Sequence, residues 1–469
     1  MRRILIIAAA TLGIGSAAWG GLWVVARGEV ETLLDREFAR LRAEGAEITF
    51  SERIVSGFPG ALSVEHRDVV FVAPDGRLRF EAEWTRTRAA ALDAGLILTT
   101  FAPEMQLRLA TPDGPVDVAI AQEALTLAVP AQERGRVARL TAMTLEVAAT
   151  GEAVGRLGDL SFADLAVDGR QGIDGTLAVD VENGSWSARW PTPEGPAALR
   201  AEGLSLAATT ATPLVPDAAA LAARPELSIL RFDVPSVALA LGETGAIRHQ
   251  RAERLEGRVV LGGGMIEGRG VYTGLEGRFG ALALPTGPVT FDGRAERFVV
   301  ETSVPFGAGV EAAPFAVEIE LEGLTGDPAL WDGLDPGERL SRDPAAVSLS
   351  VAGLGRALAA PPPGGLPFEA TEISALDLDL AGLGAALAFD GSGRIAPPME
   401  GAGTLRLEGA EGLIDGLAAA GLIQPAQLIL PRAFLLGYTR AEGDGDVRVV
   451  DLAFTNGVLT ANGVPVTGP

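Results

Sequence analysis

Short runs in which apolar and polar residues alternate recur along most of this chain. In RLRFEAEW, residues 77–84, every second side chain is apolar, and turn-forming residues bound the run. Since successive side chains of a strand point to opposite faces, this pattern predicts antiparallel strands with one apolar and one polar face. The same pattern appears in residues 105–110, 124–129, 176–183, 315–323 and 375–382.

Helical spacing of apolar residues is confined to a few segments. Residues 29–42 carry Val, Leu and Phe three or four positions apart among charges, which predicts a helix. Residues 217–223, between two prolines, predict a short helix. Two longer apolar runs, residues 411–423 and 425–438, predict a helical hairpin whose second arm is interrupted at Pro431.

The chain begins with two arginines and an uncharged apolar run, Ile4 to Ala26. A helix of this length spans a bilayer core, and the arginines favour a cytoplasmic N-terminus with the rest of the chain exported. The alternative is a signal peptide cleaved before Trp19. Because the apolar run continues well beyond that cut, a retained inner-membrane anchor with a periplasmic body is the favoured interpretation.

The predicted fold is mainly β. An N-terminal transmembrane helix precedes a long antiparallel, curved β-sheet, open as a groove or closed as a sandwich, and a short C-terminal helical hairpin follows at 411–438. The triproline segment at residues 361–365 is the best linker signal. The predicted divisions are a membrane anchor at 1–26, a juxtamembrane helix at 27–45, and β-rich regions at 46–212, 226–360 and 366–469.

A corner is predicted between the first two strands of the exported body. Gly57 and Pro59 suit a sharp change of direction, and Phe58 between them is expected to project as an apolar plug.

Composition narrows the possible functions. The chain has no cysteine, which excludes disulfides, thiolate catalysis and cysteine-ligated zinc, and all 38 of its basic residues are arginine. The formal net charge of −23 opposes binding to nucleic acid and to anionic lipid headgroups. Any contact with lipid is therefore expected to be apolar, through acyl chains.

Candidate chemistry is sparse. His66 and His249 have no neighbouring nucleophile or metal-ligand spacing, and both are predicted to be solvated. The glycine-rich GLGRALA, residues 353–359, is predicted to be a turn, because the following prolines leave no room for a phosphate-binding helix. The acidic run at 442–447 lacks the loop of a calcium site. Asp377 and Asp379 are predicted to point into water. We therefore predict no catalytic residue, no cofactor, no metal site and no enzymatic activity.

Several motifs carry a resemblance to a known family. They are the SGFP corner at 56–59, the segment LWDGLDPGERLSRDPA at 330–345, and the segments at 412–423 and 454–466. On these motifs the chain resembles the alphaproteobacterial domain-of-unknown-function 2125 family of single-anchor envelope proteins. The family-motif residues, for which a structural role is expected, are Gly57, Phe58, Pro59, Trp331, Asp335, Pro336, Arg342, Asp343 and Pro344.

That family is in turn distantly similar to AsmA-like envelope proteins. The resemblance implies a β-groove with an apolar floor that carries phospholipid chains, and it brings no catalytic residues. Two hypotheses follow. In the first, the exported body binds or helps to transfer lipid in envelope maintenance. In the second, the protein is a non-enzymatic envelope scaffold or assembly partner with a closed β core.

Overall fold

A computed structural model describes most of the chain between residues 27 and 466. It leaves undescribed residues 1–26, 29–30, 33, 37, 58–60, 91–95, 112–113, 131–136, 151–158, 172–175, 193–194, 211–227, 241–246, 285–286, 307–311, 359–367, 396–397, 444–445, 456 and 467–469. The predicted anchor, the predicted helix at 217–223, the linker at 361–365, and Phe58 and Pro59 therefore lie outside the described residues. Within the described part, no helix is long and apolar enough to cross a membrane.

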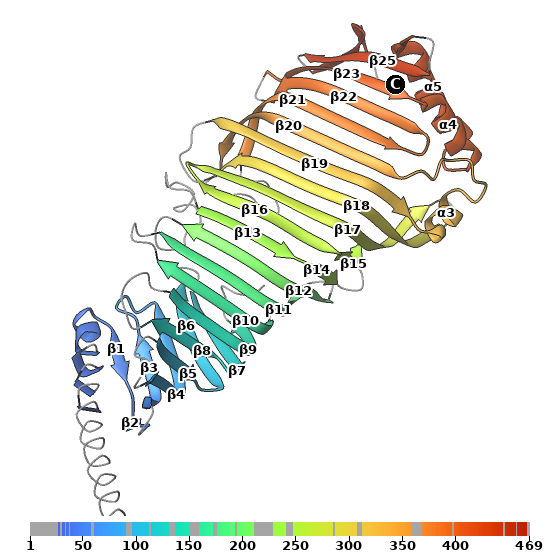
Figure 1. Ribbon diagram of the computed structural model, residues 1–469. Helices are drawn as coiled ribbons and strands as arrows, with labels where there is room; N and C mark the ends of the chain where they lie inside the picture. Colours follow the sequence, from blue (N-terminus) through green and yellow to red (C-terminus); the bar gives the residue numbers. More distant parts are fainter. Residues whose placement is uncertain are drawn as a thin grey trace, which may run out of the picture. The chain divides into compact units, whose positions relative to one another are not determined.

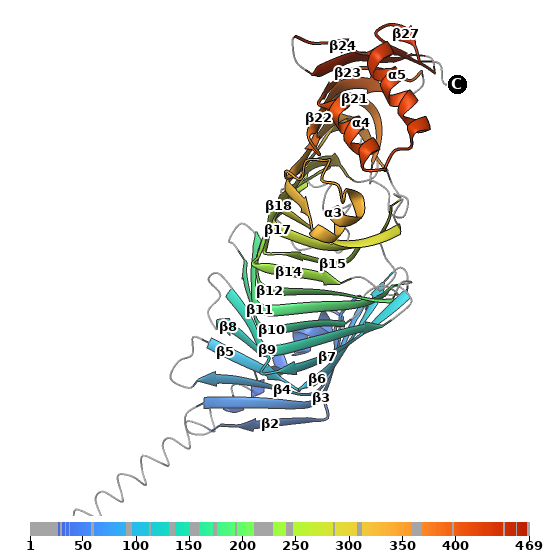
Figure 2. The same ribbon diagram turned by 90° about the vertical axis from the view of Figure 1, so that its right-hand side faces the viewer.

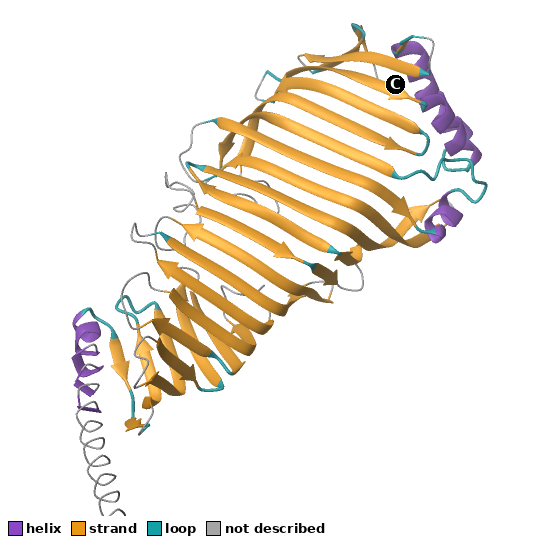
Figure 3. Ribbon diagram, in the orientation of Figure 1, coloured by secondary structure: helices purple, strands orange, loops and turns teal. Residues whose placement is uncertain are grey.

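The chain divides into two compact units. Unit 1 comprises residues 1–173 and 179–191, and unit 2 comprises residues 174–178 and 192–469. Strands dominate both units, as Figure 3 shows in orange. In each unit the strands form a long antiparallel sheet, which confirms the predicted mainly β class.

The strands of unit 1 pair mostly with their neighbours in sequence. They are β1 (Glu47–Thr49), β2 (Glu52–Ser56), β3 (Ala61–Val72), β4 (Leu78–Ala90), β5 (Leu96–Phe101), β6 (Glu104–Thr111), β7 (Gly114–Glu123), β8 (Thr126–Pro130), β9 (Val137–Thr150), β10 (Asp159–Gln171) and β11 (Leu177–Thr192), the last of which begins in residues assigned to unit 2. Strand β4 pairs with both β5 and β6, and β9 pairs with both β7 and β8. Two successive short strands thus take the place of one long bent strand.

Unit 2 continues the same antiparallel pattern with longer strands, which run side by side in Figure 1. They are β12 (Gly195–Thr210), β13 (Ser228–Val234), β14 (Ser236–Ala240), β15 (Ile247–Ala252), β16 (Arg254–Gly262), β17 (Met265–Leu284), β18 (Gly287–Pro305), β19 (Ala313–Gly326), β20 (Ala345–Ala357), β21 (Phe368–Gly382), β22 (Ala385–Arg394), β23 (Glu400–Glu408), β24 (Arg440–Ala441), β25 (Val447–Thr455), β26 (Val458–Ala461) and β27 (Val464–Pro465).

Helices occupy few positions. The described residues between 27 and 43 include a helix, as predicted. In unit 2, α3 (Pro328–Leu334) follows β19, and α4 (Ala410–Ala419), the 3-10 turn η2 (Pro425–Leu428) and α5 (Ile429–Tyr438) form the predicted hairpin, with α4 and α5 visible together in Figure 2. Pro431 lies in the first turn of α5, where its missing N–H leaves no intrahelical bond unmade. It therefore does not interrupt the arm, and that part of the prediction was wrong.

Residues with positive φ interrupt the strand pairing in each unit. In unit 1, Asp68 in β3 and Asp164 in β10 have φ values of 51° and 53°, and each is skipped in the pairing with the neighbouring strand. In unit 2, Gly274 in β17 and Gly323 in β19 have φ values of 60° and 67° and are skipped in the same way, while the register on either side of each stays the same. Since a left-handed residue departs from the extended conformation, the strand changes direction locally at each of these positions.

Small buried residues pair with the residues next to these positions. In unit 1, Ala82 and Ala142 are among the core residues that pack with Met105, Leu125 and Leu165. In unit 2, Ala295, which pairs with Leu275 next to Gly274, is 3% exposed. Their methyl groups are closely covered by neighbouring protein atoms.

The C-terminal edge of unit 2 is short and blocked. Strand β27 has two residues, one of them Pro465, and pairs with β26. Beside it, Asn462 accepts from the backbone N–H of Asp451 and donates through Nδ2 to the carbonyl of Tyr438. Part of the free edge of β25 is therefore occupied by a side chain where a further strand would pair.

Two predictions about polar segments differ from the structure. Residues 353–357, expected to be a turn, continue strand β20. Two of them are glycines, and the rings of Phe315 and Phe368 pack against their backbone where a side chain would otherwise stand. His66, expected to be solvated, is 8% exposed, since Phe38 of the N-terminal helix and Phe50 cover it. Asp377 and Asp379 are exposed, as predicted.

Candidate functional site

The strand register separates an apolar from a polar face in unit 2. Residues paired across antiparallel strands point to the same face, so a row of partners can be followed from strand to strand. One row, which defines the apolar face, contains Leu230, Val259, Gly268, Thr302, Val317, Val351, Leu376, Gly391, Gly403 and Leu452. The adjacent row, which defines the polar face, contains Arg231, Arg258, Arg269, Glu301, Glu318, Ser350, Asp377, Asp390, Thr404 and Asp451.

A cavity of about 330 Å³ opens on the apolar face near the C-terminal edge of unit 2. It lies where β22 ends and β23 begins, at the other end of these strands from α4. The apolar side chains that line it are Ile373, Leu376, Phe389, Ile395, Met399, Leu452, Phe454 and Leu459. We refer to this cavity as the apolar hollow. Its volume and its lining are those of a small site for an apolar ligand.

Three glycines, Gly393, Gly401 and Gly403, line the apolar hollow. Gly391 lies opposite Gly403, and Gly393 lies opposite Gly401, so β22 and β23 present bare backbone toward the apolar side. The ring of Phe389 lies against the first pair: a Cβ added at Gly403 would stand 2.5 Å from it. At the second pair, the atoms nearest to an added Cβ belong to the backbone of the paired strand. Any side chain at these positions would reduce the depth of the hollow.

The rim of the apolar hollow is unusually exposed for apolar residues. Ile395, Met399 and Leu459 are 41%, 51% and 41% exposed, and all three line the cavity. Since large aliphatic side chains are normally buried, a cluster of exposed ones around a cavity indicates a binding surface. The described residues of the chain leave this surface open.

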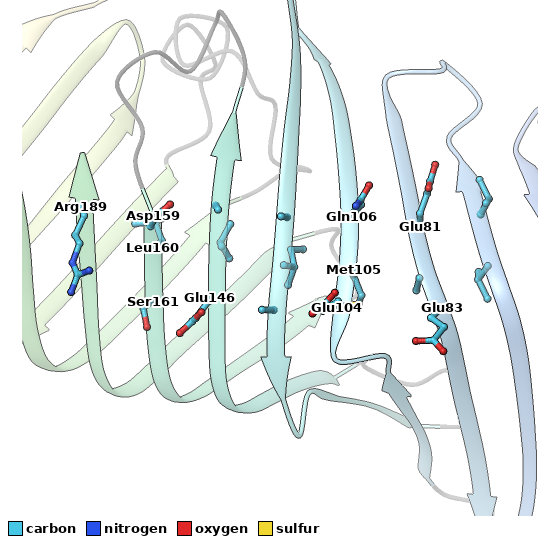
Figure 4. Close-up of a pocket in the computed structure, with 18 of the residues that line it drawn as sticks. Glu81, Glu83, Glu104, Met105, Gln106, Glu146, Asp159, Leu160, Ser161 and Arg189 are labelled. Atoms are coloured by element: carbon cyan, nitrogen blue, oxygen red, sulfur yellow. The ribbon is translucent and has the colours of Figure 1, made fainter. Parts of the chain in front are cut away.

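The polar face of unit 1 carries a larger cavity, of about 870 Å³, with a different character. In Figure 4, Glu81 and Glu83 of β4, Glu104 of β6 and Glu146 of β9 project from strands of one sheet, with Arg189 of β11 farther along. The carboxylates outnumber the single arginine, yet among the described residues no group of acidic side chains or histidines has the geometry to hold a metal ion. This acidic cavity carries no assignable chemistry.

His66 is the one histidine whose side-chain surroundings the structure describes. Arg53 donates from Nε to its Nε2 at 3.1 Å, and the rings of Phe38 and Phe50 lie 5.6 and 4.8 Å from it. Burial, and then the charge of Arg53, lower the pKa of His66 to about 4. The imidazole is therefore neutral and held as a hydrogen-bond acceptor, which is a structural role. The side chain of His249 lies outside the described residues.

The residues that were predicted to be family motifs occupy structural positions. Gly57 ends β2 with a φ of 105°, and a Cβ there would lie 2.2 Å from the carbonyl oxygen of Ala61. The Trp331–Pro344 segment forms α3 and the loop after it. Within that loop Asp335 is fully buried and accepts from the backbone N–H of Leu340 at 2.7 Å.

The remaining motif residues pack around that loop. The guanidinium of Arg342 lies 5.5 Å from the centre of the Trp331 ring and donates to the carbonyl of Asp335. Leu340, 6% exposed, contacts α4 at Gly416, where a Cβ would lie 2.8 Å from its side chain. Pro336, Asp343 and Pro344 are exposed in the same loop. The motif thus joins α3 to α4 and lies away from the apolar hollow.

The sequence interpretation did not single out the residues of the apolar hollow. A signal was available: Gly-Ser-Gly at 391–393 and Gly-Ala-Gly at 401–403 fall in neighbouring alternating segments. Glycine at every second position of a strand removes side chains from one face only. The pairing register that places these glycines opposite one another was needed to recognise a cavity.

Comparison with known proteins gives a family. A family model described as an uncharacterized protein conserved in bacteria, domain of unknown function 2125, matches residues 23–264. No curated protein and no solved structure matches the chain. The match covers more than half of the 469 residues. The chain therefore belongs to this uncharacterized bacterial family.

Proposed function

We propose that this protein is a single-pass inner-membrane protein whose periplasmic body binds acyl chains of lipid and helps to transfer them in envelope maintenance. The observation that carries the proposal is the apolar hollow, an open cavity with exposed Ile395, Met399 and Leu459 at its rim. The apolar N-terminal run, the one-sided strands and the distant resemblance to AsmA-like proteins support it.

The energetics favour an acyl chain over a charged ligand. Each methylene group that moves from water into an apolar site contributes about 0.8 kcal/mol, and the hollow offers aliphatic and aromatic contacts along its whole lining. The net charge of −23 opposes anionic headgroups over most of the surface. Binding would therefore depend on the hydrocarbon part of the lipid. The proposal assigns no catalytic residue and no cofactor.

Photo-crosslinking of the full-length protein in membranes tests the proposal. Cells are supplied with a fatty acid that carries a diazirine and is incorporated into phospholipid, and lipid attached to the protein is measured after irradiation. We expect Met399→Glu to reduce lipid crosslinking in the peptide that contains residues 395–403 of the hollow, which we call the hollow peptide. A bound acyl chain would have to remove water from the new carboxylate, which costs free energy.

Met143→Glu is the matched control, since Met143 is 54% exposed, close to the 51% of Met399, but lies in unit 1. It should leave crosslinking of the hollow peptide unchanged. Wild-type protein without lipid on that peptide, or an equal loss in both variants, would contradict the proposal.

A second candidate function is an envelope scaffold with a closed core. The buried cluster of Ala82, Met105, Leu125, Ala142 and Leu165 favours it, because these apolar side chains of unit 1 are covered by protein. A scaffold would give a specific protein partner after crosslinking in cells and no lipid on the hollow peptide. The same experiment therefore separates the two functions.

A further inference from the structure

Three arginines stand in a row on the polar face of unit 2. Arg231 of β13 is paired in register with Arg258 of β16, and Arg258 is paired with Arg269 of β17. Partners in neighbouring antiparallel strands lie about 5 Å apart at Cα and project to the same side. Three positive charges are thus placed next to one another in a chain with an excess of acidic residues.

The acidic residues around the row leave two of these arginines unpaired. Glu301 lies 3.4 Å from Arg269. Asp233 is held by Arg254 through two hydrogen bonds of 2.7 and 2.9 Å, which lower the pKa of its carboxyl group. Glu256 also pairs with Arg254, at 3.4 Å. With the part of the chain that the structure describes, the side chains of Arg231 and Arg258 form no ion pair and no hydrogen bond.

This arrangement costs stability unless an anion compensates it. Like charges directly opposite one another on two strands are destabilising, and here the acids that could relieve the repulsion are bound to Arg254. Glu267, two residues before Arg269 on the same face, is the nearest remaining carboxylate by register, and no ion pair joins it to the row. The uncompensated charge is therefore located at Arg231 and Arg258.

A cavity lies over the same residues. Its volume is about 760 Å³, and Arg231, Arg258 and Arg269 all line it. The lining also includes the hydroxyl groups of Thr302, Ser303 and Ser350, of which Ser303 and Ser350 belong to rows of the polar face. Five carboxylates line it as well: Asp233 and Glu256 pair with Arg254, Glu301 pairs with Arg269, and the other two are Glu267 and Glu318. Guanidinium groups beside hydroxyl groups form the donor set that binds a phosphate group, since guanidinium can donate two parallel hydrogen bonds to its oxygens.

We propose that Arg231 and Arg258, assisted by Arg269, bind a phosphate-type oxyanion in this cavity. The site lies on the opposite face of the sheet from the apolar hollow, so a single lipid cannot occupy both. It therefore goes beyond acyl-chain binding and does not depend on it. Its ligand is a phosphate group, whether free or on the headgroup of a lipid or other phosphate ester.

Thermal unfolding of the full-length protein in a non-ionic detergent tests the site. Inorganic phosphate is titrated against chloride at matched ionic strength, since screening alone affects exposed charges. We expect a saturable rise in the Tm of the wild-type protein with phosphate. Arg258→Gln should weaken the apparent affinity for phosphate by about tenfold, because hydrogen bonds to a charged group are lost.

Arg258→Gln should also raise the Tm in chloride, because it removes the repulsion with Arg231. The control is Arg200→Gln, since Arg200 is an exposed arginine of the same unit that lies opposite Ala238. It should respond to phosphate like the wild type. No phosphate-dependent rise in the wild type, or an equal rise in Arg258→Gln, would overturn the proposal.

A second titration identifies the source of the phosphate group. Dihexanoyl phosphatidic acid, used below its micelle concentration, is compared with inorganic phosphate. Tighter binding of the lipid, lost in Arg258→Gln and retained in Met399→Glu, indicates a headgroup bound without use of the apolar hollow. Equal or tighter binding of inorganic phosphate indicates a soluble ligand. Both results support the arginine site, whereas loss of lipid binding in Met399→Glu alone overturns it for this lipid.

Discussion

Arg53 donates from its Nε to the Nε2 of His66 across the β2–β3 pair, at 3.1 Å. The same guanidinium binds Asp35 of the N-terminal helix at 2.7 Å and lies over the rings of Phe38 and Phe50. This arginine therefore attaches the helix that follows the predicted anchor to the first strands, and Arg42 of the helix adds a hydrogen bond to the carbonyl of Ile48 at 2.8 Å. The attachment requires that His66 remain an acceptor, and hence neutral.

We expect this attachment to weaken in acid. Because the pKa of His66 is lowered to about 4 in the folded protein, the unfolded state binds more protons between that value and about 6.5. The contribution to stability is complete above about pH 6.5 and decreases as the pH falls toward 4, by about 2 kcal/mol at about pH 5. Hydrogen exchange of peptides within residues 47–72, corrected for the intrinsic exchange rate at each pH, measures this loss of stability.

His66→Gln is the control, because a glutamine keeps an acceptor near Arg53 and does not titrate in this range. Peptides of this variant should show the same protection from hydrogen exchange at about pH 5 as at about pH 6.5. A wild-type protein whose protection in this region does not change with pH would show that His66 is not neutral when folded.

Substitution of Gly57 should be more damaging than substitution of Gly76. Both have positive φ, at 105° and 68°, but a Cβ at Gly57 would lie 2.2 Å from the carbonyl oxygen of Ala61, whereas at Gly76 it would meet nothing within 4 Å. We expect Gly76→Ala to cost about 1 kcal/mol, for the left-handed conformation alone. Gly57→Ala should cost about 3 kcal/mol or more, since the backbone must also shift. Comparable Tm values would contradict this ranking.

Asp335 should be essential to the loop between α3 and β20. Its Oδ2 accepts from the N–H of Leu340, and its other carboxylate oxygen, Oδ1, is buried without a hydrogen-bond partner. Asp335→Ala leaves the N–H of Leu340 unsatisfied and should cost about 1–3 kcal/mol. Asp335→Asn keeps an acceptor and removes a buried charge, so it should be close to neutral or stabilising. Thermal unfolding of both variants tests the order.

Alternation predicted the strands where one face is apolar and the other polar. Residues 315–323 lie within β19, residues 375–382 lie in β21, and the apolar runs after 411 became α4 and α5. Residues 353–357 were mistaken for a turn, because the prolines that follow excluded a phosphate-binding helix and a continued strand was not considered. Here the glycines make room for the rings of Phe315 and Phe368, a contact with residues distant in the sequence.

Both candidate sites depend on pairing register, which a single sequence does not specify. Gly393 and Gly401 define the apolar hollow only because β22 and β23 place them opposite one another. Arg231, Arg258 and Arg269 are spread over 39 positions and come together through two separate strand pairs. Composition predicted that lipid contact would be apolar. It could not show that three arginines come together on one face of a chain with a net negative charge.

The blocked C-terminal edge has a consequence for assembly. A broad antiparallel sheet that ended in a long, unpaired strand would offer its free N–H and C=O groups to the next molecule, and copies could join end to end into fibres. At the C-terminal edge of unit 2, Asn462 and the short, proline-containing β27 reduce that template. The exposed aliphatic side chains of this region therefore lie beside an edge that offers a second copy little unpaired backbone to extend.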